Sequence, residues 1–217
     1  ITASPLAHSQ NSHEPVLADQ ASDNIIGKKF TISSKILDEN RDIQIFLPES
    51  YHSNEQSYPV LYILDGQRLF TLGVSLLQSF RSEVKMSPEF IVVGINNKYP
   101  DRFSNFVKPE FLDFIEQELI PSVDTNYRTT EERILFGWEF GAALAIESLI
   151  NKPTLFSGHI AASPYPVDET WFAEQSRLEQ LESKLKTELK SHLYITVSEG
   201  EGSVLVGTEK LNTLLMA

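Results

Sequence analysis

The sequence contains no cysteine among its 217 residues, and this absence excludes several kinds of chemistry. The chain forms no disulfide, has no thiol nucleophile and offers no cysteine ligand to zinc. Basic side chains are also few: 18 lysines and arginines stand against 30 aspartates and glutamates, a formal net charge of −12. This balance argues against a nucleic acid partner, because the phosphate backbone attracts basic surfaces.

No apolar run approaches the length of a membrane-spanning helix, so we expect no membrane partner. We also expect no metal site and no cofactor, because the sequence has neither a metal-ligand spacing nor a glycine-rich phosphate loop. Hydrophobic residues make up 41% and charged residues 22%, as in ordinary soluble domains. A chain of 217 residues is long enough for one α/β domain with a sizeable core.

The first 24 residues are polar and have no hydrophobic period, which predicts an N-terminal tail before a single domain at 25–217. The sequence begins with Ile1, and Ser4-Pro5-Leu6-Ala7 has the small residues of a signal-peptide cleavage region. That interpretation favours a periplasmic or secreted protein over a cytoplasmic one. A boundary chosen for expression is the alternative.

Hydrophobic periodicity predicts one opening hairpin and then alternating strands and helices. The hairpin strands are expected at 28–37 and 42–47, with Asp38-Glu39-Asn40 between them. Buried strands are expected at 58–64, 90–95, 133–136, 158–162 and 193–197. Helices are expected at 69–84, 111–123, 142–149, 169–190 and 204–215. This order predicts an α/β fold with a mainly parallel, doubly wound sheet.

The segment Gly137-Trp138-Glu139-Phe140-Gly141 joins a predicted strand to an alanine-rich predicted helix. This is the context of the G-x-S-x-G nucleophile elbow, with glutamate in the serine position. The central residue of such an elbow adopts a strained backbone, and a Cβ at either glycine would clash. The pattern therefore places Glu139 at the nucleophile position of a hydrolase. The simpler alternative is a surface glutamate that the helix dipole favours.

Further motifs make the chain similar to the putative-esterase family of α/β-hydrolases, which includes esterase D, the enterochelin and salmochelin esterases and the mycolyltransferases. Besides the elbow, the motifs in order are Val60-Leu61-Tyr62-Ile63-Leu64-Asp65-Gly66, Phe111-Leu112-Asp113-Phe114-Ile115, Glu118-Leu119-Ile120-Pro121, Tyr127-Arg128-Thr129, Leu155-Phe156 and Ser163-Pro164. The resemblance implies an α/β-hydrolase fold. It also implies a small-molecule ester or ester-like ligand, of the carboxylic or siderophore type.

The resemblance further implies a Ser–acid–His triad and an oxyanion hole made of two backbone N–H groups. By position, these are the N–H groups of Gln67 and Phe140. Arg68 is expected to add positive charge beside them. Trp138 is expected to line the pocket, and burial against the sheet is the alternative. Arg68 is also the nearest cation in the sequence motifs, so we expect it to contact Glu139.

The triad acid is expected after the strand at 193–197, where Glu199 and Glu201 stand; a solvated turn is the alternative. None of the five histidines matches the family's catalytic histidine, which follows a later strand. We therefore expect the domain at 25–217 to lack that strand and its histidine loop. His159 lies in an apolar strand and is expected to be a core histidine.

Glutamate is ionised at neutral pH and is a poor nucleophile towards esters, so ordinary serine catalysis is not expected. Two functions stay open at this point. One is an esterase that retains hydrolysis through Glu139 or a water that it activates. The other is a non-catalytic pseudo-hydrolase that binds a ligand or a partner. A histidine within hydrogen-bond reach of Glu139 would favour the first.

Overall fold

The structure is a computed structural model that describes residues 23–83, 88–97, 102–106, 108–167, 183 and 190–216. The predicted tail at 1–24 and the predicted helix at 169–190 fall almost wholly outside these residues. Within the described part, no helix combines the length and the apolar character that crossing a membrane requires.

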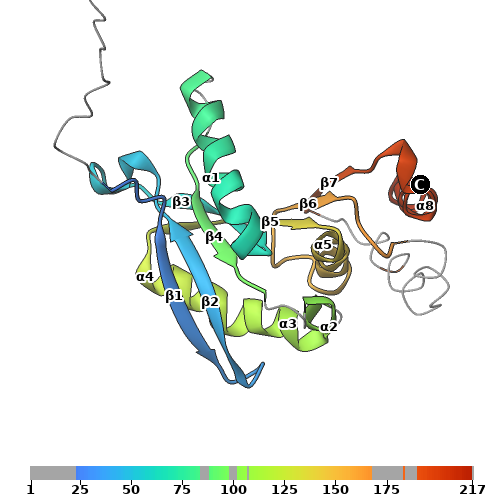
Figure 1. The fold of residues 1–217 in the computed structure, drawn as a ribbon, viewed down its shortest axis with the longest axis horizontal. Coiled ribbons are helices and arrows are strands. Elements are labelled where there is room, and N and C mark those ends of the chain that lie inside the picture. The colour runs from blue at the N-terminus through green and yellow to red at the C-terminus, as the bar shows by residue number, and fades with distance from the viewer. Residues whose placement is uncertain are drawn as a thin grey trace, which may run out of the picture.

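The described strands form a seven-stranded sheet in the order β1-β2-β4-β3-β5-β6-β7 (Figure 1). Their bounds are β1 Lys28–Ser34, β2 Glu39–Phe46, β3 Tyr58–Leu64, β4 Ile91–Ile95, β5 Thr129–Trp138, β6 Gly158–Ala162 and β7 His192–Thr196. β2 pairs antiparallel with both β1 and β4, whereas the remaining neighbours are parallel. The predicted mainly parallel sheet with an opening hairpin is therefore confirmed.

Helices cover both faces of this sheet. The helical segments are η1 Glu49–His52, α1 Gly66–Glu83, α2 Arg102–Phe106, α3 Pro109–Phe114, η2 Ile115–Leu119, α4 Ile120–Asn126, α5 Phe140–Asn151, η3 Glu199–Glu201 and α8 Ser203–Leu215. On β3, Ile63 packs with Phe70 and Val74 of α1, whereas its neighbour Tyr62 packs on the opposite face with Phe114 of α3. Figure 1 accordingly shows α1 on one side of the sheet and α3 and α4 on the other.

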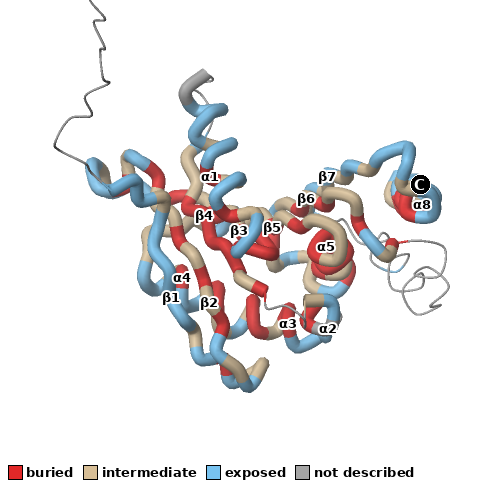
Figure 2. The backbone as a smooth tube through the Cα atoms, viewed as in Figure 1, coloured by how far each residue is buried: buried red, intermediate tan, exposed pale blue. Residues whose placement is uncertain are grey.

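The central strands are buried on both faces, and this explains their continuous apolar runs. Every residue of β4 is buried, and buried segments follow β3, β4 and α5 in Figure 2. α5 brings small residues against the sheet, among them Ala142 and Ala145, both fully buried. Packing in the core therefore fixes the edge of the sheet at which β3 and β5 end and α1 and α5 begin.

Several predicted boundaries of strands and helices were wrong, mostly next to turns. The hairpin turn lies at 35–38 and begins three residues before the predicted Asp38-Glu39-Asn40, because Glu39 and Asn40 already pair with β1. β5 is longer than the predicted strand at 133–136, and α2 lies where no helix was predicted. The helical region after α2 runs without a break through α3, η2 and α4, and so continues past Pro121, the second residue of α4.

Candidate functional site

Two strained turns of the same construction stand at the carboxyl edge of the sheet. Asp65 follows β3 with φ of 54°, and Glu139 follows β5 with φ of 53°. The carbonyl of Asp65 accepts hydrogen bonds from two amides of the first turn of α1, and that of Glu139 does the same for α5. Positive φ is rare for residues other than glycine and concentrates at functional turns. The strained backbone predicted for Glu139 is therefore confirmed.

The glycines of the elbow are needed because the chain approaches itself closely. A Cβ at Gly137 would lie 2.0 Å from the carbonyl oxygen of Gly141, which leaves no room for a side chain. A Cβ at Gly141 would lie 3.3 Å from Cβ of Leu64, a tight contact rather than a direct clash. The steric requirement predicted for both glycines is thus absolute at Gly137 and weaker at Gly141.

Arg102, the first residue of α2, connects the two strained turns. Its Nε and Nη2 donate to Oδ2 of Asp65 at 2.9 Å and 2.7 Å, and its Nη1 donates to Oε2 of Glu139 at 3.1 Å. Asp65 is fully buried, whereas the side chains of Arg102 and Glu139 are 16% and 38% exposed. The hydrogen bond to Asp65, followed by that to Glu139, raises the pKa of Arg102 against the opposing effect of desolvation. Glu139, the central residue of the elbow, is therefore an ion-paired carboxylate.

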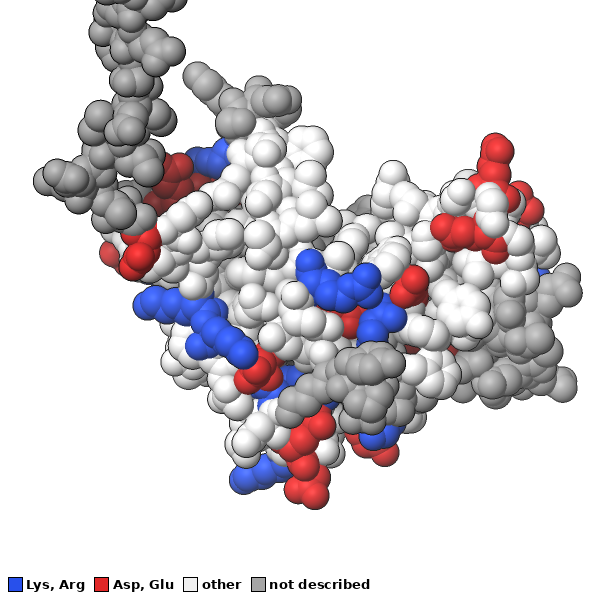
Figure 3. All heavy atoms as spheres, viewed as in Figure 1, with Lys and Arg blue, Asp and Glu red and all other residues white. Residues whose placement is uncertain are grey.

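The predicted contact between Glu139 and Arg68 was wrong. Arg68 is exposed, and its guanidinium lies 4.7 Å from the ring centroid of Trp138, above the face of the ring. It makes no ion pair with any residue that the structure describes. Sequence reasoning missed Arg102 because no local motif marks it. In Figure 3, basic and acidic side chains lie side by side between the start of α1 and α5.

Gln67 and Phe140, the predicted oxyanion-hole residues, each lie in the first turn of a helix, α1 and α5 respectively. Their N–H groups precede the first intrahelical hydrogen bonds, so they are available to a ligand. The side chain of Gln67 makes a separate contact: its Oε1 accepts a hydrogen bond of 2.8 Å from the amide of Asn97. The bridge through Arg102 ties the turns that carry these amides together, and their role in an oxyanion hole stays a prediction.

Aromatic rings surround the elbow. The ring of Phe140 meets Phe103 and Tyr165 edge-on, with centroids 4.8 Å and 5.2 Å away, and Arg102 lies 5.4 Å from its centroid. Phe103 and Tyr165 are about half exposed. Together with Trp138 under Arg68, they make a surface that is both aromatic and cationic beside Glu139.

The two acidic candidates after β7 have different surroundings. Oε1 of Glu201 accepts a hydrogen bond of 2.8 Å from Oγ of Ser163, which follows β6 with φ of 50°. Glu199 is exposed, and its side chain makes no hydrogen bond or ion pair with other residues of the described ranges. Glu201 is thus fixed to the same sheet edge as the elbow, where the amide of Glu139 donates to the carbonyl of Ala162. The role of either residue as a triad acid stays a prediction.

Histidine takes no part in this arrangement, as far as the structure describes the chain. His159 is buried in β6, with its Nδ1 3.0 Å from Oγ of Ser191, so the expected core histidine is confirmed. Burial lowers the pKa of His159 to about 4. Neither His52 nor His192 contacts Glu139. Among the described residues, no group of three or more potential ligands could hold a metal ion.

Comparison with known proteins shows similarity to siderophore esterases. The ferri-bacillibactin esterase BesA of Bacillus subtilis is 28% identical over 157 residues, which are 58% of this chain and 54% of BesA. A siderophore triacetylfusarinine C esterase of Aspergillus fumigatus is 25% identical over 174 residues, 69% of this chain and 58% of that enzyme. The chain therefore spans a little over half the length of these curated relatives.

Solved structures show the same fold. An IroE-like serine hydrolase from Shewanella oneidensis superimposes with a TM-score of 0.71 and 29% identity, over 87% of this chain and 69% of that protein. The mostly parallel sheet with its flanking helices is thus an α/β-hydrolase fold. The model of the family described as Putative esterase matches residues 34–215, most of the sequence. The chain is a member of the putative esterase family.

Proposed function

We propose that this protein binds an anionic, ester-containing small molecule of the siderophore type at the carboxyl edge of its sheet and does not hydrolyse it by serine chemistry. The observation that carries the proposal is the ion pair between Glu139 and Arg102 at the position of the nucleophile. A serine hydrolase needs a hydroxyl at this point and a base to take its proton. Here an arginine stabilises a carboxylate instead, and no histidine of the described ranges contacts it.

The surroundings of the elbow support an anionic ligand with flat groups. Arg68 is exposed, is held over Trp138 and has no acidic partner within the described ranges. A guanidinium in such a position binds carboxylate or phenolate oxygens and stacks on aromatic groups. The free amides at the starts of α1 and α5 favour negative charge in the same region. The names of BesA and of the triacetylfusarinine C esterase point to siderophores as the ligand class.

A second function, residual hydrolysis, is favoured by one feature of Glu139. Only its Oε2 is engaged by Arg102, while Oε1 has no partner among the described residues and the side chain is 38% exposed. A carboxylate with one free oxygen accepts a proton from water, which then attacks an ester carbonyl as hydroxide. The two functions differ in a measurable way, because only the second needs Glu139 for turnover.

The test combines a binding assay with a hydrolysis assay. Binding of ferri-bacillibactin is measured by quenching of tryptophan fluorescence. We expect Arg68→Ala to weaken binding about tenfold, the effect of losing one charge-assisted contact. Lys29→Ala removes the same charge from an exposed side chain of β1 and serves as the matched control. Equal losses of affinity in the two variants would contradict the proposed binding surface.

Hydrolysis is followed with p-nitrophenyl acetate and by chromatography of ferri-bacillibactin. We expect wild-type protein to be no faster than Glu139→Ala, because the Ser–His step that supplies most of the rate is missing. Saturable turnover that disappears in Glu139→Ala would overturn the non-catalytic function and establish the second one.

A further inference from the structure

A pocket lies away from the elbow, at the opposite edge of the sheet. It has a volume of about 330 Å³. The residues that matter most for its chemistry are Phe46, Leu77 and Phe90 on its apolar side and Glu49, Arg81 and Glu89 on its polar side. Phe90 precedes β4, so the pocket is at the amino end of a strand that runs parallel to β3. Glu139 and Arg102 stand at the carboxyl ends, so the two sites are separate.

A buried carboxylate is the main polar feature of this pocket. The side chain of Glu89 is only 10% exposed, and its Oε2 accepts a hydrogen bond from Oγ of Ser50. Its Oε1 lies 3.1 Å from Nη2 of Arg81 but accepts no hydrogen bond within the described structure. Buried carboxylates are costly unless their oxygens are well satisfied. Oε1 of Glu89 can therefore accept a hydrogen bond from a donor with better geometry than that of Arg81.

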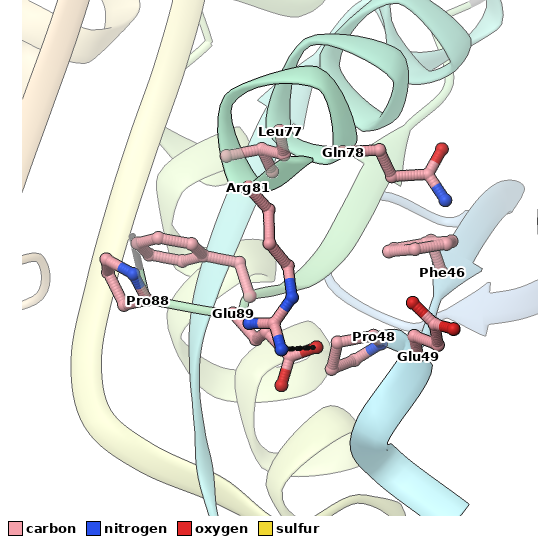
Figure 4. A pocket seen from close by; sticks show the side chains of 9 residues that line it. Phe46, Pro48, Glu49, Leu77, Gln78, Arg81, Pro88 and Glu89 are labelled. Atoms are coloured by element: carbon pink, nitrogen blue, oxygen red, sulfur yellow. Dashed lines mark ion pairs between the residues drawn. The ribbon is translucent and has the colours of Figure 1, made fainter. Parts of the chain in front are cut away.

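The charges of the pocket favour a cation. Glu49 is exposed and has no partner among the described residues, and with Glu89 it outnumbers the single guanidinium of Arg81. Figure 4 shows Arg81 reaching from α1 towards Glu89, with Phe46, Pro48 and Glu49 across the space. Arg81 is 44% exposed, so its flexible side chain can turn to solvent when another cation takes its place.

We propose that this pocket binds a small organic ammonium with an apolar body. The ammonium donates hydrogen bonds to the carboxylates of Glu89 and Glu49, and the apolar body packs against Phe46, Leu77 and Phe90. Pockets of this size with apolar walls and few polar groups are typical of small-molecule sites. Arg81 is then a competitor that occupies the cation position in the empty state. The site is independent of the function proposed for the elbow.

The test uses three probes of similar shape, 2-phenylethylamine, 2-phenylethanol and 3-phenylpropionate, whose binding to the whole chain is followed by calorimetry and NMR chemical shifts. We expect the amine to bind at least about tenfold more tightly than the propionate, since only the amine pairs with the carboxylates. Binding of the propionate as tight as that of the amine, or no saturable binding of the amine, would overturn the proposal.

Two variants are expected to change the affinity for the amine in opposite directions. Arg81→Met keeps an unbranched apolar stem and removes the competing cation, so the affinity for the amine is expected to rise several-fold. Glu49→Gln is expected to lower it, and because Glu49 is exposed this variant should fold normally. Glu209→Gln, an equal change of charge at an exposed position of α8, is the control and should leave binding unchanged. Weaker binding of the amine by Arg81→Met would show that Arg81 holds the ligand, and the proposal would fail.

Discussion

Replacing Arg102 by methionine is expected to destabilise the protein strongly, because the guanidinium neutralises a buried charge. Asp65 is fully buried and receives two N–H groups from Arg102. Breaking a buried ion pair by removing one partner costs roughly 3–5 kcal/mol, since the remaining charge is left unpaired. The contact with Glu139 adds at most about 1 kcal/mol, because that carboxylate is 38% exposed. The total is a large part of the roughly 5–15 kcal/mol that stabilises a typical domain.

The measurement is urea unfolding followed by circular dichroism. With a urea dependence of about 2 kcal/mol per molar, a loss of about 4 kcal/mol lowers the midpoint by about 2 M. Arg68→Met is the matched control: it removes the same charge from an exposed guanidinium that stacks on Trp138, and should cost under about 1 kcal/mol. In the double variant Asp65→Asn/Arg102→Met the buried charge is gone, so we expect part of the stability to return. Similar losses for Arg102→Met and Arg68→Met, or a double variant less stable than either single one, would refute the reasoning.

Two further predictions follow from packing and burial. Gly137→Ala should prevent stable folding, because its Cβ would lie 2.0 Å from a backbone oxygen, whereas Gly158→Ala, which meets Ile134 at 3.5 Å, should melt within a few degrees of wild type. Normal melting of Gly137→Ala would contradict the elbow geometry. Burial lowers the pKa of His159 to about 4, below the unfolded value of about 6.5, so the folded state resists protonation. The contribution of neutral His159 to the free energy of unfolding is complete above pH 6.5 and falls by up to about 3 kcal/mol as the pH drops to 4. Urea midpoints across this range should fall more steeply for wild type than for His159→Gln, and equal slopes would show that His159 titrates normally.

Local patterns in the sequence were sufficient for the elbow and for most of the sheet. The strand at 58–64 and the strand at 158–162 were predicted with the bounds that the structure has. The strained turn at Glu139 followed from two glycines and from the change of period between a strand and a helix. These features depend on contacts between residues close in the chain, so a sequence pattern records them.

The partner of Glu139 was decided by tertiary structure. Arg102 is 37 residues from both Asp65 and Glu139, and no motif relates the three. They meet because the sheet order places β3 between β4 and β5, so that the chain leaving β4 passes the carboxyl ends of its neighbours. Arg68, which the sequence puts closer to Asp65, lies on the exposed side of α1 and stacks on Trp138 instead. The sequence by itself determined which residue stands at the elbow; the packing of distant segments determined which charge that residue meets, because ion pairing depends on proximity in space rather than along the chain.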